Sequence, residues 1–270
     1  MFIDINGTKY HVDVKGAGQP LLLLHGFTGD SSTWTSFLPK WGQNYKVISI
    51  DIIGHGKTDS PERIEKYHIS EVTDQINKIL DELKIPSVHL LGYSMGGRLA
   101  IAYYMKYPQT VKKLILESSS PGLRTEEERR ERRIQDEALG NYILKHGMEC
   151  FINKWESIPL FKSQQRLDES IKKKIRNQRL ANHVIGLSNS LKGMGTGAQP
   201  SYWLEISKIA KKTLLITGEL DQKFVQIAKN MTKMNELLTH ISVKDAGHAI
   251  HVEKPEIFGT IVMEFLADQL

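Results

Sequence analysis

The strongest chemical signal in the sequence is a serine placed between two glycines. The segment Gly92–Gly96 reads GYSMG, which fits the pattern G-x-S-x-G; it follows the apolar segment Val88–Leu91 and opens a helical pattern. The strand-to-helix context makes the motif specific, because the turn is so tight that a side chain at either glycine would collide with the backbone. The helix N-terminus beneath the turn favours negative charge developing at the serine. The pattern therefore predicts a reactive Ser94, in preference to a plain strand–helix connection.

A serine hydroxyl reacts only when a base takes its proton, and position selects that base among the ten histidines. His248 follows the last strand-like segment and precedes the final helix, so it should lie in a loop at the same sheet edge as the serine. We predict His248 as the base. His251, three residues further on, is the main competitor.

The acid that orients the base should follow the strand before it. Asp221 ends the loop Gly218–Asp221, directly after an apolar strand pattern, and gives the chain order serine, acid, histidine. We therefore predict Asp221 as the acid. Glu219 in the same loop, and Glu117 at the end of another strand, stay open as alternatives.

A second glycine-containing loop, His25–Gly29, follows the apolar segment Leu21–Leu24. In this arrangement such a loop supplies one backbone N–H to an oxyanion hole, here that of Phe27, and the residue after the nucleophile, Met95, supplies the other. The alternative is a glycine turn that merely ends a strand.

The elements that would position these residues alternate along the chain between strand and helix. This alternation requires crossover connections, and it predicts an α/β fold with a mostly parallel central sheet and helices on both faces. Strands are predicted over residues 10–14, 21–24, 46–50, 88–91, 111–116, 213–217 and 241–243, and helices over 72–83, 95–107 and 255–266.

The alternation stops after Glu117 and resumes at Thr213, and the sequence between is helical and rich in charge. The simplest organisation is one core interrupted by an insertion. We predict a first part of the core over residues 1–120, a helical cap over 121–203 and a second part of the core over 204–270.

Composition is that of an ordinary globular protein, with 40% hydrophobic and 25% charged residues and a net charge of +5. Basic residues gather in the insertion, but acidic residues interleave with the first cluster, so a charged helical surface is favoured over a nucleic-acid face. A subset facing an anionic small molecule is the alternative. The single cysteine, Cys150, fits a reducing compartment. No signal peptide or membrane segment is recognisable, so we expect a cytoplasmic protein without a membrane partner.

Together with the loop Asp51–Asp59, the residues above resemble the α/β-hydrolase superfamily. A narrower set of segments is formed by Gly92–Arg98, Ser120–Leu123 with the Glu/Arg-rich run after it, Ala198–Pro200 and Gly218–Phe224. This set is similar to the 2-succinyl-6-hydroxy-2,4-cyclohexadiene-1-carboxylate synthase (MenH) family of menaquinone biosynthesis. The resemblance implies a lyase that eliminates pyruvate from an enolpyruvyl precursor, with no cofactor and no metal.

Arg98 supports the narrower resemblance on physical grounds. It lies four residues after Ser94, one turn into the helix and on the same side as the serine. A helix packed on a sheet seldom carries an unpaired arginine there, whereas the carboxylate of an anionic ligand would match the guanidinium fork.

By motif position, the resemblance also implies a set of substrate-binding residues, three of them in the cap: Tyr93, Arg98, Arg132, Trp155 and Arg179. In the cap, Arg129 or Arg133 could take the place of Arg132, and Arg176 could take that of Arg179. Each of these arginines could equally be an exposed cap residue, and Trp155 could simply belong to the cap core.

We therefore expect a lyase acting on an anionic small molecule, without nucleic acid as a partner; a homo-oligomer stays open. One alternative is a carboxylester or carbon–carbon bond hydrolase with the same triad. The other is a non-catalytic binding protein on the same fold, which would have no need of all three triad groups.

Overall fold

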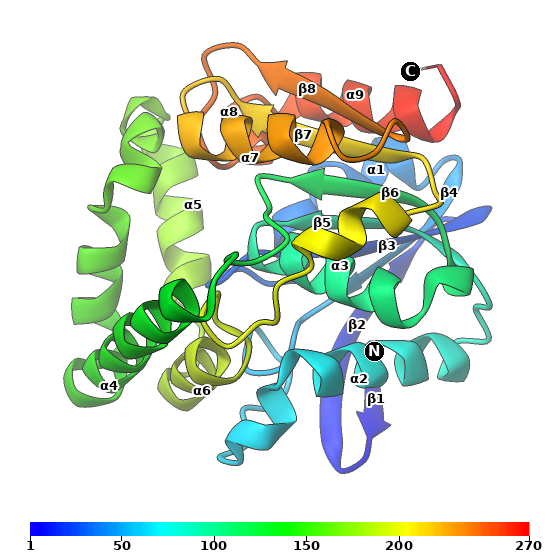
Figure 1. Cartoon of the computed structure of the whole chain (residues 1–270). Helices are drawn as coiled ribbons and strands as arrows, with labels where there is room; N and C mark the ends of the chain where they lie inside the picture. The colour runs from blue at the N-terminus through cyan, green and yellow to red at the C-terminus, as the bar shows by residue number, and fades with distance from the viewer. Residues whose placement is uncertain (270) are drawn as a thin grey trace.

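A mixed β-sheet forms the centre of the molecule (Figure 1). The structure is a computed structural model and describes residues 1–269. Within them, eight strands lie in the order β1-β2-β4-β3-β5-β6-β7-β8. β1 pairs antiparallel with β2 and β2 with β4, and all other neighbours run parallel. The strands are β1 (Phe2–Ile5), β2 (Thr8–Lys15), β3 (Gln19–Leu24), β4 (Tyr45–Ile50), β5 (Val88–Tyr93), β6 (Val111–Glu117), β7 (Thr213–Gly218) and β8 (Leu238–Val243).

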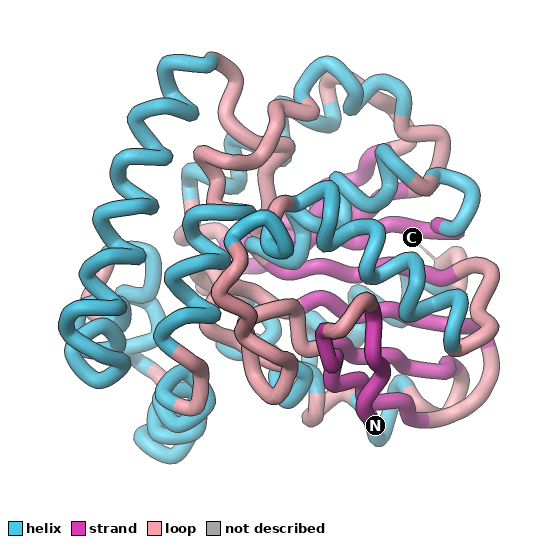
Figure 2. Tube along the Cα trace, turned by 90° about the horizontal axis from the view of Figure 1, so that it is seen from below, coloured by secondary structure: helices cyan, strands magenta, loops and turns pink. Residues whose placement is uncertain are grey.

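The central strands are buried on both faces, which explains their unbroken apolar runs. In β3, Leu22 and Leu24 pack into one hydrophobic cluster, and Leu21 and Leu23 pack into another on the opposite face. Helices α2, α3 and α7 supply the first cluster, and α1, α8 and α9 supply the second. Figure 2 shows the strands running through the molecule with helices around them. These helices are α1 (Leu38–Trp41), α2 (Ile69–Glu82), α3 (Met95–Lys106), α7 (Gln222–Thr232), α8 (Ile250–Glu253) and α9 (Pro255–Leu266).

Between β6 and β7 the chain forms helices, which Figure 1 shows gathered at one end of the sheet. A small core of their own, which includes Ile143, Phe151 and Leu187, holds them together. Gly147, with φ 77° and ψ 176°, breaks the long first helix into two segments. The helices are α4 (Glu126–Glu156), α5 (Glu169–Leu180) and α6 (Val184–Met194). The 3-10 helices of the described residues are η1 (Ser31–Trp34), η2 (Ile64–Tyr67), η3 (Pro108–Thr110), η4 (Pro159–Arg166) and η5 (Trp203–Lys208).

The predicted α/β class, with a mostly parallel sheet and helices on both faces, is confirmed. The predictions did not include β1, a short edge strand, or α7, whose first residues belong to the loop that carries Asp221. The division into core and cap at residues 120 and 203 stays a prediction. Within residues 1–269, no helix is long and apolar enough to cross a membrane.

Candidate active site

The turn between β5 and α3 holds Ser94 in a strained backbone conformation, with φ 50° and ψ −106°. Its flanking glycines are required by close contacts. A Cβ on Gly92 would lie 2.3 Å from the carbonyl oxygen of Gly96, and a Cβ on Gly96 would lie 2.2 Å from that of Leu24. Ser94 N–H donates to the Glu117 carbonyl at 2.9 Å, which ties the turn to the end of β6. The turn therefore has the geometry that the G-x-S-x-G pattern predicts.

Ser94, His248 and Asp221 form a continuous hydrogen-bonded chain. The Ser94 hydroxyl lies 2.9 Å from His248 Nε2, and His248 Nδ1 lies 2.6 Å from Asp221 Oδ2. With Nδ1–H donating to the carboxylate, Nε2 is free to accept the serine proton. The His248 side chain is 2% exposed, and the rings of Phe224 and Tyr93 lie against it, with centroids at 4.8 and 5.5 Å. This arrangement can take a proton from a bound molecule or activate the serine.

The competing residues are engaged elsewhere. His251 Nδ1 lies 2.9 Å from both carboxylate oxygens of Glu117, so this second imidazole and this alternative acid pair with each other. Glu219 accepts a hydrogen bond from Asp245 N–H at 3.2 Å. Within residues 1–269, the side chains of these three residues form no hydrogen bond with the side chain of Ser94 or His248.

The two predicted oxyanion donors, Phe27 and Met95, line the same cavity as Ser94. Within residues 1–269, neither backbone N–H donates to another group. Met95 N–H is at the first position of α3, where a helix leaves its N–H groups without intrahelical partners. Both donors are therefore available to an oxygen of a bound molecule.

The triad opens into a cavity of about 210 Å³ between the core and the cap helices. Among the residues that the structure describes, its lining includes the cations Arg98, Arg132 and Lys223 and no aspartate or glutamate. Lys223 was missed in the sequence analysis, although its position two residues after Asp221, in the first turn of α7, places it beside the triad. The cavity therefore suits a negatively charged ligand.

Arg98 is the cation closest in sequence to the nucleophile, and its guanidinium donates to the Met194 carbonyl at 2.9 Å and to Gln199 Oε1 at 2.8 Å. Within residues 1–269 it has no carboxylate partner. Burial, with a smaller effect of neighbouring Arg132, lowers the pKa of Arg98 to about 10. A ligand carboxylate would offset both effects.

In the cap, the structure places Arg132 on the cavity, with its Nε donating to the buried carboxylate of Asp136 at 2.8 Å. The alternatives Arg129 and Arg133 instead pair with Glu126 and do not line this cavity. Trp155 lines the cavity and also packs on the cap core, and its indole N–H has no partner within residues 1–269.

The two remaining predicted residues, Tyr93 and Arg179, line different sets of cavities. Tyr93 lines the triad cavity and a second, adjoining cavity, whereas Arg179 lines only the latter and a surface pocket. Arg179 donates to Glu156 Oε1 and Gln164 Oε1 at 3.3 Å each, and its guanidinium lies 4.8 Å from the Phe161 ring centroid. Its alternative, Arg176, pairs with Glu156 at 2.7 Å and lines neither cavity.

Comparison with known proteins supports the fold and narrows the family. Residues 19–255 match the α/β-hydrolase fold family. A Bacillus subtilis (strain 168) protein, provisionally named 2-succinyl-6-hydroxy-2,4-cyclohexadiene-1-carboxylate synthase, is 47% identical over 263 residues, which cover 97% of this chain and 96% of that protein. The structure of MenH from S. aureus superposes with a TM-score of 0.91 and 38% identity, covering 96% of this chain and 98% of the other.

An enol-lactonase from Burkholderia xenovorans LB400 has a TM-score of 0.86 at 18% identity, covering 99% of this chain and all of the other (100%), and this likeness concerns the fold alone. The triad geometry, the cavity and the two closer relatives agree on one assignment. The chain belongs to the α/β-hydrolase fold family and, within it, to the family of 2-succinyl-6-hydroxy-2,4-cyclohexadiene-1-carboxylate synthases.

Proposed function

We propose that this chain is a carbon–oxygen lyase of menaquinone biosynthesis, which eliminates pyruvate from 2-succinyl-5-enolpyruvyl-6-hydroxy-3-cyclohexene-1-carboxylate to give 2-succinyl-6-hydroxy-2,4-cyclohexadiene-1-carboxylate. The names of the similar proteins support this reaction. The observation that carries it is that the triad opens into a cavity whose described lining contains three cations and no carboxylate. A substrate with several carboxylates matches that lining.

In the proposed mechanism, Asp221 holds the His248 ring so that the His248–Ser94 pair can remove a proton from the substrate ring. The electron pair of that C–H bond forms a new ring double bond. The ring C–O bond to the enolpyruvyl group breaks, and the leaving enolate takes a proton on carbon to become pyruvate. No water is consumed and no acyl-enzyme forms.

The remaining roles follow from position. Backbone N–H groups of Phe27 and Met95 stabilise the substrate carbonyl oxygen on which charge develops during proton removal. Arg98 and Arg132 bind substrate carboxylates, with Trp155 and Tyr93 packing against the ring. Arg179, in the adjoining cavity, would reach only a group that extends past Tyr93. The enzyme needs no cofactor or metal, and we place it in the cytoplasm.

The direct test is to incubate the purified protein with the enolpyruvyl precursor. One pyruvate and one conjugated cyclohexadiene should form per substrate consumed, and the Ser94→Ala protein, with the same cavity and charge, should be the inactive control. Hydrolysis of a neutral ester without any pyruvate release from the precursor would favour the serine hydrolase alternative. Neither reaction, in a protein that still binds the precursor, would favour the non-catalytic binding protein.

A further inference from the structure

Next to the triad, across the Tyr93 ring, lies a buried carboxylate–imidazole pair that the triad does not use. The Glu117 side chain is fully buried, at 0% exposed, and both of its oxygens lie 2.9 Å from His251 Nδ1. The backbone N–H of His251 also donates to Glu117 Oε1 at 3.0 Å. Because a buried carboxylate is stable only when it is paired, the imidazole is held with Nδ1–H toward Glu117 and its orientation is fixed.

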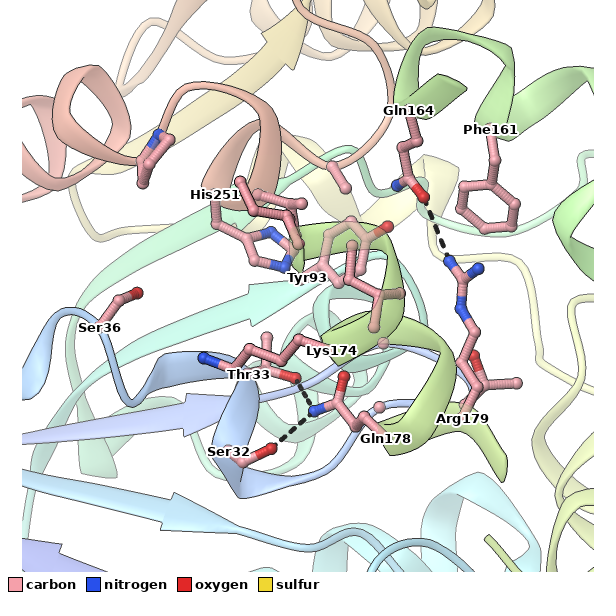
Figure 3. A pocket seen from close by; sticks show the side chains of 18 of the residues that line it. Ser32, Thr33, Ser36, Tyr93, Phe161, Gln164, Lys174, Gln178, Arg179 and His251 are labelled. Atoms are coloured by element: carbon pink, nitrogen blue, oxygen red, sulfur yellow. Dashed lines mark hydrogen bonds between the residues drawn. The ribbon is translucent and has the colours of Figure 1, made fainter. Parts of the chain in front are cut away.

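The opposite edge of that imidazole faces a cavity. His251 lines a space of about 390 Å³ between the core and α5, and within residues 1–269 its Nε2 has no hydrogen-bond partner. In Figure 3 the rings of His251 and Tyr93 lie on one side of this space, and Lys174, Gln178 and Arg179 enter it from α5. When protonated, the His251 ring donates to Glu117 on one side and offers an Nε2–H to the cavity on the other.

The lining of this cavity is cationic and apolar. Lys174 and Arg179 contribute positive charge, and no aspartate or glutamate of the described part of the chain lines the space. Glu156 partly compensates Arg179 at 3.3 Å, whereas Lys174 forms no ion pair within residues 1–269. Apolar walls come from α5 and from the segment after the triad histidine, namely Ile171, Ile175, Ala249, Val252 and Pro255.

Aromatic rings separate this cavity from the triad. Phe27, Tyr93 and Phe161 line both spaces, whereas Ser94, His248 and Arg98 line the triad cavity and do not line the second one. The Tyr93 ring lies between the two imidazoles, with its centroid 5.5 Å from that of His248 and 4.5 Å from that of His251. A molecule in the second cavity can therefore be bound without contact to the nucleophile.

We propose that this second cavity is a binding site for an organic carboxylate with an apolar body, whose carboxylate lies between His251 Nε2 and Lys174. The apolar part then packs on Ile171, Ile175 and Val252. The Nε2–H of the protonated His251 ring and the Lys174 ammonium are donors that match a carboxylate, and the absence of acidic residues in the described lining removes the repulsion that would exclude one. The site does not depend on the proposed lyase reaction, because no triad residue contacts it.

The test is titration calorimetry with cyclohexanecarboxylate as the probe and cyclohexanecarboxamide as its uncharged match. His251→Asn keeps an amide donor for Glu117 but removes the Nε2 edge, so Kd for the probe should rise roughly tenfold. Lys174→Met, at an exposed position, should raise Kd about threefold. Lys173→Met on the same helix, outside this cavity, is the control and should leave Kd unchanged.

Arg98→Ala distinguishes the two cavities, because Arg98 lines only the triad cavity. A binding event that persists in Arg98→Ala and weakens in both His251→Asn and Lys174→Met supports the second site. Binding lost in Arg98→Ala but unchanged in Lys174→Met would assign the carboxylate to the triad cavity and overturn the proposal. Equal affinity for the amide, or no binding heat with the unaltered protein at millimolar probe, would also overturn it. Thermal unfolding of His251→Asn checks that this variant is folded. Lys174→Met tests the second site even if His251→Asn does not fold, because Lys174 is exposed.

Discussion

Two carboxylate–imidazole pairs lie on either side of the Tyr93 ring. They differ mainly in the group that faces Nε2 of the imidazole. In Asp221–His248, Nε2 meets the Ser94 hydroxyl at 2.9 Å. In Glu117–His251, Nε2 meets a cavity lined by lysine and arginine. Both imidazoles are oriented through Nδ1, at 2.6 Å in the first pair and 2.9 Å in the second. Orientation by a carboxylate is thus common to both, and the group placed at Nε2 decides whether the pair can do proton chemistry or bind an anion.

The largest effect expected from this comparison is the loss of turnover when the first pair is broken. His248→Ala, Ser94→Ala and Asp221→Ala should each lower kcat for pyruvate release by roughly 10³- to 10⁶-fold, and the losses should not add in double variants because the three groups act as a unit. His251→Asn should retain kcat within about threefold, a factor that corresponds to less than one hydrogen bond. A His251→Asn loss as large as that of His248→Ala would mean that the two pairs work together in the reaction.

The next effect concerns stability and belongs to the second pair. Glu117→Ala leaves the His251 Nδ1–H and the His251 backbone N–H without their acceptor in a fully buried position. We expect the free energy of unfolding in urea to fall by about 3–5 kcal/mol. Glu219→Ala is the matched control, since Glu219 is exposed and accepts one hydrogen bond at 3.2 Å, and it should cost no more than about 1 kcal/mol. Similar losses in the two variants would show that the buried pair contributes no special stability.

A change at Arg98, in the triad cavity, should affect an anionic substrate more than an uncharged one. Arg98→Ala should lower activity on the enolpyruvyl precursor by roughly 10- to 1,000-fold, which corresponds to a lost charge-assisted hydrogen bond of about 1.5–4 kcal/mol. Hydrolysis of an uncharged ester, if present, should change little, and Arg98→Lys should recover only part of the loss because an ammonium lacks the planar fork. Arg133→Ala, outside the cavity, is the control. Equal losses on both substrates would assign Arg98 a structural role through its bonds to Met194 and Gln199.

The sequence predicted the first pair better than the second, for physical reasons. Ser94, Asp221 and His248 each follow a strand pattern, and parallel strands bring their carboxyl ends to one edge. His251 and Glu117 carried the same positional signal, so spacing alone could rank them only as competitors. Their pairing depends on the direction of two side chains, which no periodicity encodes.

The cap illustrates the same limit. Five cap arginines were candidates, and helical periodicity could not select among them because their helices pack against each other as well as on the core. In the structure, Arg132 lines the triad cavity and donates to buried Asp136, whereas Arg179 lies in the adjoining cavity beyond Tyr93. Lys223 was not predicted as a site residue, because a lysine in the first turn of an unpredicted helix cannot be distinguished by sequence from an ordinary surface lysine.

Within residues 1–269, His55 is a buried imidazole without a carboxylate partner, and it gives the smallest expected effect, a change in how the free energy of unfolding depends on pH. Burial, and next the nearby charge of His25, lowers the pKa of His55 to about 3. His55 is fully buried, and its Nδ1 lies 3.1 Å from the Ile53 carbonyl, an acceptor that fixes a neutral ring with Nδ1–H. In the unfolded chain the His55 ring takes up a second proton below about pH 6.5, whereas in the folded protein it does so only at about pH 3. The stability contributed by neutral His55 is therefore lost as pH falls from about 6.5 toward about 3.

His55→Asn removes the titrating ring and keeps a donor for the Ile53 carbonyl. Below pH 6.5 the unfolding free energy of the unaltered protein should fall by up to about 1.4 kcal/mol per pH unit more steeply than that of the variant, because one proton fewer is bound by the folded state. Urea denaturation at intervals from about pH 7.5 down to about pH 4.5, which starts above the unfolded-state pKa of about 6.5 and enters the upper part of the window, measures this slope. The variant should also lose stability at neutral pH, through its smaller side chain, without any change in slope there. Parallel slopes in the two proteins would mean that folded His55 accepts a proton as readily as the unfolded chain, and the distinction between paired and unpaired imidazoles would then fail at this position.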